Sequence, residues 1–122
     1  MHKIYGTYCA ALTPINSDRS INKELFLNHC KHLLAEGVDG LAVFGTTGEA
    51  NSFSMSEKIE AINYLIDNNV KAEKLIPGIG QCSIKDTIAL SQMAAKLIQM
   101  QHYYIKINLK AFITQQIMLM DI

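Results

Sequence analysis

The stretch GLAVFGTTGE at residues 40–49 decides the fold of this chain. It is a short apolar run that ends abruptly in glycines, hydroxyls and one acid. A run of about 4 to 8 apolar residues bounded by turn formers is typical of a buried strand covered on both faces of a parallel α/β sheet. We expect Gly45 and Gly48 to adopt backbone geometries closed to other residues, so that two threonine hydroxyls and free N–H groups converge on one small ligand. The stretch therefore predicts a strand that leads into a binding loop.

A helix is expected directly after this loop. SMSE at residues 54–57 has the S-x-x-E form of a capping box. Apolar residues then recur at helical spacing, at Met55, Ile59, Ile62, Leu65 and Ile66. The central part of the chain is thus predicted to run strand, glycine-threonine loop, helix.

The same pattern precedes and follows this unit. Residues 5–12 are β-compatible and stop at Thr13-Pro14, after which Asn22 caps a helix that ends near Gly37. Its inward residues are expected to be Leu25, Phe26, Leu33 and Leu34. LIPGIG at 75–80 predicts a third strand, and SIKD at 83–86 predicts a second box-like cap. The helix behind that cap carries Ile84, Ile88, Ser91, Ala94, Ala95 and Ile98 at helical spacing.

Regular alternation of short strands with amphipathic helices predicts a parallel sheet with right-handed crossovers. Two architectures fit this order. A doubly wound sheet is complete within roughly 120 to 150 residues, whereas a (β/α)8 barrel takes about 250. The length of 122 residues, taken alone, favours the first.

Composition narrows the class of partner. Eleven basic and eleven acidic side chains give a formal net charge of zero, with no run of like charges, so we expect no binding to nucleic acid or anionic lipid. No apolar segment approaches the roughly 18 residues of a membrane helix, and the amino terminus has no apolar signal core. A cytoplasmic protein with a small-molecule partner is expected.

Cysteine and histidine positions give no metal or disulfide pattern. Cys9, Cys30 and Cys82 are odd in number and form no C-x-x-C, which predicts reduced thiols. His29 and His32 stand three residues apart on one predicted helix, but no third ligand has suitable spacing, so no metal site is expected.

A family resemblance favours the (β/α)8 barrel over the doubly wound sheet. GTTGE at 45–49 resembles the signature loop of the dihydrodipicolinate synthase and N-acetylneuraminate lyase family, the class I pyruvate aldolases built on a (β/α)8 barrel. ALTP at 11–14, EGVDGL at 36–41 and LIPGIG at 75–80 resemble the same family in the same order, and the resemblance runs from about residue 5 to 97. It implies an α/β fold in which residues 1–98 form the first three βα units of a (β/α)8 barrel, incomplete in this chain.

The resemblance also implies roles for the loop. In the family a lysine amine condenses with the keto group of pyruvate, and the resulting enamine attacks an aldehyde, or the reverse reaction cleaves a keto acid. Thr46 and Thr47, with nearby N–H groups, would hold the pyruvate carboxylate, and the Thr46 hydroxyl would join a proton relay with a tyrosine. Gly45 and Gly48 would shape the turn, and Glu49 would brace the loop. The family needs no separate cofactor, forms homo-oligomers and takes pyruvate with an aldehyde such as aspartate semialdehyde.

The rest of the family machinery is not expected in this chain. The Schiff-base lysine lies on strand six of the family barrel and the relay tyrosine on strand five. Residues 99–122 contain no glycine, proline or glutamate, and we interpret them as a divergent tail, from a truncated or frame-shifted member. Such a chain is expected to be inactive alone.

Three readings remain beside a synthase-like pyruvate aldolase. The first is a sialic acid or keto-deoxy sugar acid lyase, because the residues that discriminate the aldehyde lie mostly in the missing half. The second is a nucleotide-binding module, since GIGQCS at 78–83 is superficially like G-x-G-x-x-G/A, although it lacks the third small residue and the following acid. The third is a non-catalytic interaction fragment.

Overall fold

The computed structural model describes residues 5–99 as three βα units on one parallel sheet. The units are β1 (Tyr8–Ala10) with α1 (Lys23–Ala35), β2 (Gly40–Val43) with α2 (Met55–Asp67), and β3 (Leu75–Pro77) with α3 (Ile84–Gln99). Two short 3₁₀ helices, η1 (Ala50–Ser52) and η2 (Ala72–Lys74), precede α2 and β3. The predicted order of elements is confirmed, and the predicted tail at 99–122 lies outside the described residues except for Gln99.

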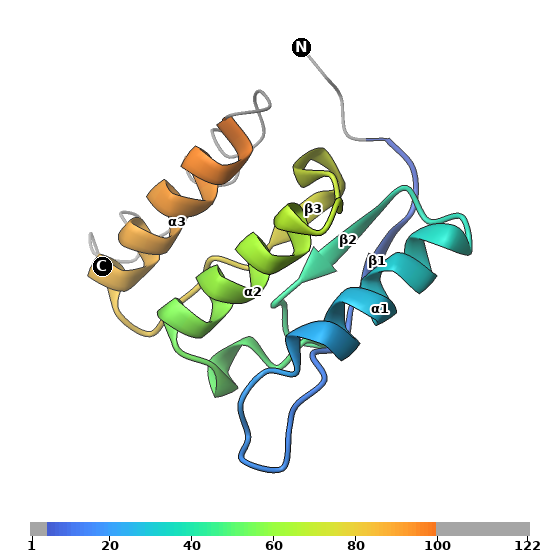
Figure 1. Ribbon diagram of the computed structural model, residues 1–122. Helices are drawn as coiled ribbons and strands as arrows, with labels where there is room; N and C mark the ends of the chain where they lie inside the picture. The colour runs from blue at the N-terminus through green and yellow to red at the C-terminus, as the bar shows by residue number, and fades with distance from the viewer. Residues whose placement is uncertain (1–4, 100–122) are drawn as a thin grey trace.

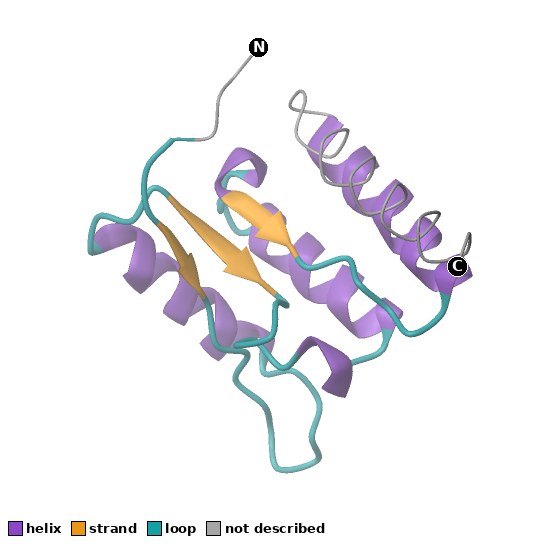
Figure 2. Ribbon diagram, turned by 180° about the vertical axis from the view of Figure 1, so that it is seen from behind, coloured by secondary structure: helices purple, strands orange, loops and turns teal. Residues whose placement is uncertain are grey.

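The sheet is open, with strand order β1-β2-β3 and parallel pairing throughout. Cys9 pairs with Leu41, and Leu41 pairs with Leu75, so these three residues form one row across the sheet. Figures 1 and 2 show the three helices on one side of the sheet and none in front of its other face. Three of the four residues of β2 are buried and Ala42 is half-buried, so the strand is largely buried, as expected, and within the described residues its helices lie on one face only.

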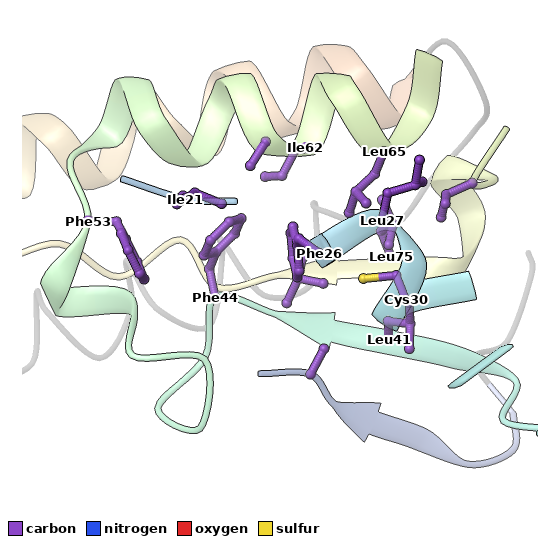
Figure 3. Close-up of a cluster of buried hydrophobic side chains, with 14 residues drawn as sticks. Ile21, Phe26, Leu27, Cys30, Leu41, Phe44, Phe53, Ile62, Leu65 and Leu75 are labelled. Atoms are coloured by element: carbon purple, nitrogen blue, oxygen red, sulfur yellow. The ribbon is translucent and has the colours of Figure 1, made fainter. Parts of the chain in front are cut away.

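The core lies between the sheet and the first two helices (Figure 3). Leu41 and Val43 from β2 are fully buried and belong to one cluster with Phe26 from α1 and Leu65 from α2. Full burial of an apolar side chain of this size stabilises the fold by about 1.5–3 kcal/mol. These few contacts hold the strands beneath the helices and fix where each strand ends.

Local capping places the helices as the sequence predicts. The Asn22 side chain accepts a hydrogen bond from the Leu25 N–H at 2.9 Å, and the Ser54–Glu57 capping box is complete. Ser83 accepts from the Asp86 N–H at 3.3 Å. All three predicted caps are confirmed, because a cap depends on residues only three positions apart.

Two predicted helix faces need correction. Leu25, expected inside, is 52% exposed; Phe26 is buried as expected, and α1 also buries Leu27 and Cys30. On α3, Ile84 and Ile88 are exposed, Ser91 and Ala94 are buried in line with the predicted stripe, and Thr87 is buried outside it. The two buried hydroxyls donate to backbone carbonyls of their own helix, at 3.0 Å to Ser83 and 2.6 Å to Thr87, so these residues can be buried without an unsatisfied group.

No helix within residues 5–99 is long and apolar enough to cross a membrane.

Candidate functional site

The GTTGE loop lies at the carboxyl end of β2. The loop closes on itself, since the Glu49 N–H donates to the Thr46 carbonyl at 3.1 Å and the Ala50 N–H donates to the Gly45 carbonyl at 3.2 Å. Because all three strands are parallel, the segments after β1 and β3 reach the same end of the sheet. This is the end at which parallel α/β proteins bind ligands.

The residues with positive φ values lie at the two ends of the loop. Phe44 and Glu49 have positive φ values of 54° and 52°, whereas Gly45 and Gly48 do not adopt the left-handed region. The expectation that these two glycines carry the special geometry is therefore wrong. Phe44 is held in place because its ring is 1% exposed and packs against Phe26 and Phe53, with centroid separations of 5.5 and 6.2 Å. Buried aromatic contacts thus stabilise a strained conformation beside the loop.

Gly48 lies where a side chain would have little space. A Cβ atom at this position would lie 3.0 Å from the Ala11 carbonyl oxygen and 3.2 Å from Thr13 Oγ1. The buried Thr13 hydroxyl donates to the Gly48 carbonyl at 2.8 Å, so the end of the first strand holds the loop directly. The sequence predicts Thr13 only as the end of a strand. The signal that could have identified its role is a hydroxyl side chain in the Thr13-Pro14 pair that ends the first strand.

Gly78 brings the third strand against the same loop. A Cβ atom there would collide with the Phe44 carbonyl, and the Gly78 N–H donates to the Val43 carbonyl at 2.8 Å. The first glycine of GIGQCS is thus explained by strand packing, and its presence needs no phosphate ligand.

A cleft of about 570 Å³ opens between the loop after β2 and the loop after β3. Three predicted site residues line it, namely Gly45, Thr46 and Glu49, whereas Thr47 and Gly48 do not. Thr47 is exposed at the surface and Gly48 is buried. The other lining residues are Phe44, Ala50, Asn51, Ser52, Gly78, Gly80, Gln81 and Cys82. Nothing lies within 4 Å of a Cβ placed on Gly45 or Gly80, so a ligand can approach the backbone closely at both.

The residues that line the cleft offer neutral polar groups and one acidic side chain. Of the residues that line it, only Glu49 carries a formal charge, and no lysine, arginine or histidine is among them. Gln81 comes from the loop after β3, where its N–H donates to Thr87 Oγ1 at 3.1 Å. The lining can hold a small oxygen-rich ligand through hydroxyl and N–H groups. It does not itself offer an amine nucleophile.

Two ionisable groups are buried in the helix layer, Lys58 on α2 and Cys30 on α1. Lys58 on α2 is 1% exposed, and burial lowers the pKa of its ammonium group, while the charge of Cys82 acts in the opposite direction. Burial also raises the pKa of the Cys30 thiol to about 12. Within residues 5–99, no three histidine, cysteine, aspartate or glutamate side chains gather in a way that holds a metal.

Parallel βα units with a polar cleft at the carboxyl ends of the strands define the class of α/β enzymes that includes the (β/α)8 barrels. The sequence profile described as the dihydrodipicolinate synthetase family matches residues 3–110, and the chain belongs to that family.

The relatives are synthases from bacteria and archaea. The chain is 36% identical over 88 residues to the 4-hydroxy-tetrahydrodipicolinate synthase of Desulforudis audaxviator, a match that covers 72% of this chain and 30% of the relative. It is 33% identical over 122 residues to that of Haloarcula marismortui, covering 96% of this chain and 40% of the relative. The chain thus spans about a third of the length of these relatives.

Solved structures place the same residues at the start of a barrel. Dihydrodipicolinate synthase from Agrobacterium tumefaciens superposes with a TM-score of 0.73 at 26% identity, covering 77% of this chain and 33% of that one. N-acetylneuraminate lyase from Proteus mirabilis gives a TM-score of 0.68 at 34% identity, covering 76% and 32%. The three βα units therefore match the N-terminal part of a (β/α)8 barrel, as the sequence predicts.

The family match also extends beyond the predicted limit of resemblance. It ends at residue 110, whereas the sequence analysis placed that limit at about residue 97. The frame-shift interpretation of residues 99–122 stays a prediction.

Proposed function

We propose that this chain supplies the pyruvate-carboxylate loop of a class I pyruvate-dependent aldolase of the dihydrodipicolinate synthase type. Its homology to dihydrodipicolinate synthases and 2-keto-3-deoxygluconate aldolases covers only part of those proteins. One aldolase variant from Sulfolobus solfataricus, which superposes with a TM-score of 0.66 at 31% identity, was solved as a pyruvate complex. A pyruvate-binding role for the corresponding residues of this chain extends that likeness.

The observation that carries the proposal is the position of Thr46. Thr46 lines the cleft at the carboxyl end of β2, beside the open backbone of Gly45. A carboxylate placed there accepts hydrogen bonds from the Thr46 hydroxyl and from loop N–H groups, which are strong because the acceptor is charged. Thr47, outside the cleft lining, would contribute through its backbone and hydroxyl at the base of the turn. Glu49 would brace the loop from its left-handed position.

The covalent step would be carried by residues that this chain does not contribute to the cleft. By the family resemblance, a lysine on strand six attacks the keto carbon of pyruvate and water leaves as the imine forms. A tyrosine on strand five relays protons through the Thr46 hydroxyl. We propose that the described residues bind and orient pyruvate, and that they do not form the imine.

A chimera tests the role of Thr46 directly. The matching segment of the Desulforudis synthase is replaced by the corresponding residues of this chain, and kcat/KM for pyruvate is measured with aspartate semialdehyde. We expect activity in the chimera and a loss of about 10²- to 10³-fold in Thr46→Val, the cost of removing one preorganised donor. Thr46→Ser should recover most of the loss because it restores the hydroxyl.

Thr7→Val is the matched control, because Thr7 is exposed and precedes β1 at the opposite end of the sheet from the cleft. It should leave kcat/KM unchanged. An active chimera in which Thr46→Val retains full activity would refute the proposed role.

A further inference from the structure

Cys82 lies at the edge of the cleft, directly before the third helix. It is exposed and lines the cleft, and the next residue, Ser83, caps α3. The N-terminal end of a helix carries a partial positive charge, which favours an anion beside it. Cysteines that react are found in partly exposed and electropositive places of this kind, because the thiolate is the nucleophile.

Lys58 on α2 is a buried side chain that has no partner of opposite charge. The residue is 1% exposed, and the ion pair found within residues 5–99 joins Lys23 to Glu60 instead. In the described part of the chain, every sealed side-chain nitrogen or oxygen has a hydrogen-bond partner. No hydrogen bond acts on the Lys58 ammonium group, so its nitrogen keeps a small accessible area. A lysine with a covered stem and an open head directs its charge toward the opening that it reaches.

The opening that Lys58 reaches is the one beside Cys82. Burial lowers the pKa of the Lys58 ammonium group, and among the described residues the thiolate form of Cys82 is the charge that opposes this effect. The fold agrees, since Lys58 lies near the start of α2 and Cys82 lies just before the start of α3. These two helices lie side by side and pack against each other (Figure 1). An ammonium group and an ionisable thiol therefore meet at the starts of two neighbouring helices.

Other charged side chains lie near this pair along the chain. Glu49 lines the same cleft, and Lys85 and Asp86 occupy the first turn of α3. All three are exposed, so that solvent and salt screen them more strongly than they screen Lys58. Lys58 is therefore the charge that acts most strongly on the Cys82 sulfur.

We propose that Cys82 is a modification site for low-molecular-weight disulfides that carry carboxylates, with Lys58 as the counter-ion of its thiolate. The Cys82 thiolate attacks one sulfur of the disulfide, a mixed disulfide forms, and the original S–S bond breaks. The other half of the reagent leaves as a thiolate, which takes a proton from water. Because Cys82 and Thr46 line one cleft, the attached group occupies part of that cleft. The inference does not depend on pyruvate binding.

Thiol–disulfide exchange on the full 122-residue chain tests the proposal. The chain is treated with oxidised glutathione, which carries carboxylates, or with cystamine, which carries ammonium groups, and the rate at each cysteine is followed by peptide mass spectrometry. We expect Cys82 to react before Cys9 and Cys30 with both reagents. The ratio of the glutathione rate to the cystamine rate at Cys82 should fall about three- to tenfold in Lys58→Met, because the ammonium group attracts carboxylates and repels cations.

Two further variants and one change of conditions isolate the charge of Lys58. Lys58→Arg keeps the positive charge and should keep the ratio. Lys71→Met is the matched control, because Lys71 is exposed and lies before β3, at the opposite end of the sheet from the cleft. It should leave the ratio unchanged. Circular dichroism checks the fold of each variant, and in the wild-type chain the ratio should also fall as salt is added.

The proposal is overturned if Cys82 reacts no faster than Cys9, if Lys58→Met keeps the wild-type ratio, or if the ratio in the wild-type chain does not fall with salt. These outcomes are separate from those of the proposed function. Thr46→Val in the chimera tests pyruvate binding without touching Cys82, and the exchange rates need no catalytic activity.

Discussion

The two faces of the sheet differ in how their apolar residues are used. On the covered face, Leu41, Val43 and Leu75 are buried beneath α1 and α2. On the open face, Ala10 and Leu12 remain exposed and Ile76 is half-buried. The first face stabilises the described fold internally. The second has no such role within residues 5–99, and in the solved relatives the matching segment is the N-terminal part of a (β/α)8 barrel.

Cysteine reactivity gives the largest expected difference between the covered side and the cleft. Cys30 lies on the buried face of α1, and burial raises the pKa of its thiol to about 12, which leaves almost no thiolate at pH 8. Its alkylation in the folded chain should be about a thousandfold slower than that of a free cysteine, before any steric protection is counted. Cys82 is exposed at the cleft and should react first. Iodoacetamide labelling followed by peptide mapping measures both, and rapid labelling of Cys30 would contradict the described core.

Truncation of a core aromatic should be the most destabilising of the substitutions considered. Phe26 is fully buried and packs against Phe44 with a tilted ring contact, and Phe44 anchors the strained end of β2. Phe26→Ala should lower the free energy of unfolding by about 3–5 kcal/mol. Urea denaturation followed by circular dichroism measures this change. A loss of less than about 1 kcal/mol would show that the covered face is not the true core.

Replacing Lys58 should raise the free energy of unfolding, whereas replacing Phe26 lowers it. The Lys58 residue as a whole is 1% exposed, and no acidic group lies within 4 Å of its ammonium nitrogen among the described residues. Lys58→Met should therefore stabilise the fold, by about 1 kcal/mol or more, since it keeps the buried stem and removes the charge. Lys71→Met, at an exposed position, is the control and should have little effect.

The same lysine predicts a pH dependence. Burial lowers its pKa in the folded state below the ordinary value of 10.5, so the folded chain binds fewer protons than the unfolded chain between the two values. The free energy of unfolding should therefore rise with pH in this window and lose that rise in Lys58→Met. Thermal melts at several pH values up to 10.5 test the slope. An identical slope in both proteins would rule out Lys58 as its source.

The smallest effect is expected on the open face. Leu12→Ala should change the free energy of unfolding of the chain alone by at most about 0.5 kcal/mol, because the residue is already 57% exposed in the folded chain. The same denaturation experiment measures it alongside Phe26→Ala. A loss of several kcal/mol would mean that the open face is already covered in solution.

Local features of the fold could be predicted from the sequence, because they depend on neighbouring residues. Asn22 and the Ser54–Glu57 box cap their helices as expected, and the apolar run at 40–43 forms a strand. The inward faces of α1 and α3 could not be predicted as well. Leu25 and Ile84 fit a helical stripe, yet which side of a stripe is buried depends on the neighbouring helix and strand.

The site was predictable in composition but not in geometry. Thr46 and Glu49 line the cleft and Thr47 does not, and the left-handed backbone falls on Phe44 and Glu49 rather than on the glycines. Phe44 adopts this conformation because two distant aromatic rings hold it, a long-range effect that no local motif encodes. The Thr13 hydroxyl on Gly48 is likewise a contact between residues 35 positions apart.

Borohydride reduction in the presence of pyruvate, with peptide mass spectrometry, tests most directly the claim that this chain binds pyruvate but does not form the imine. Both the 122-residue chain and its chimera with the Desulforudis synthase are treated. We predict no adduct on the chain alone, and in the chimera a single adduct on a lysine of the synthase-derived part. An adduct on any lysine contributed by this chain would contradict the claim.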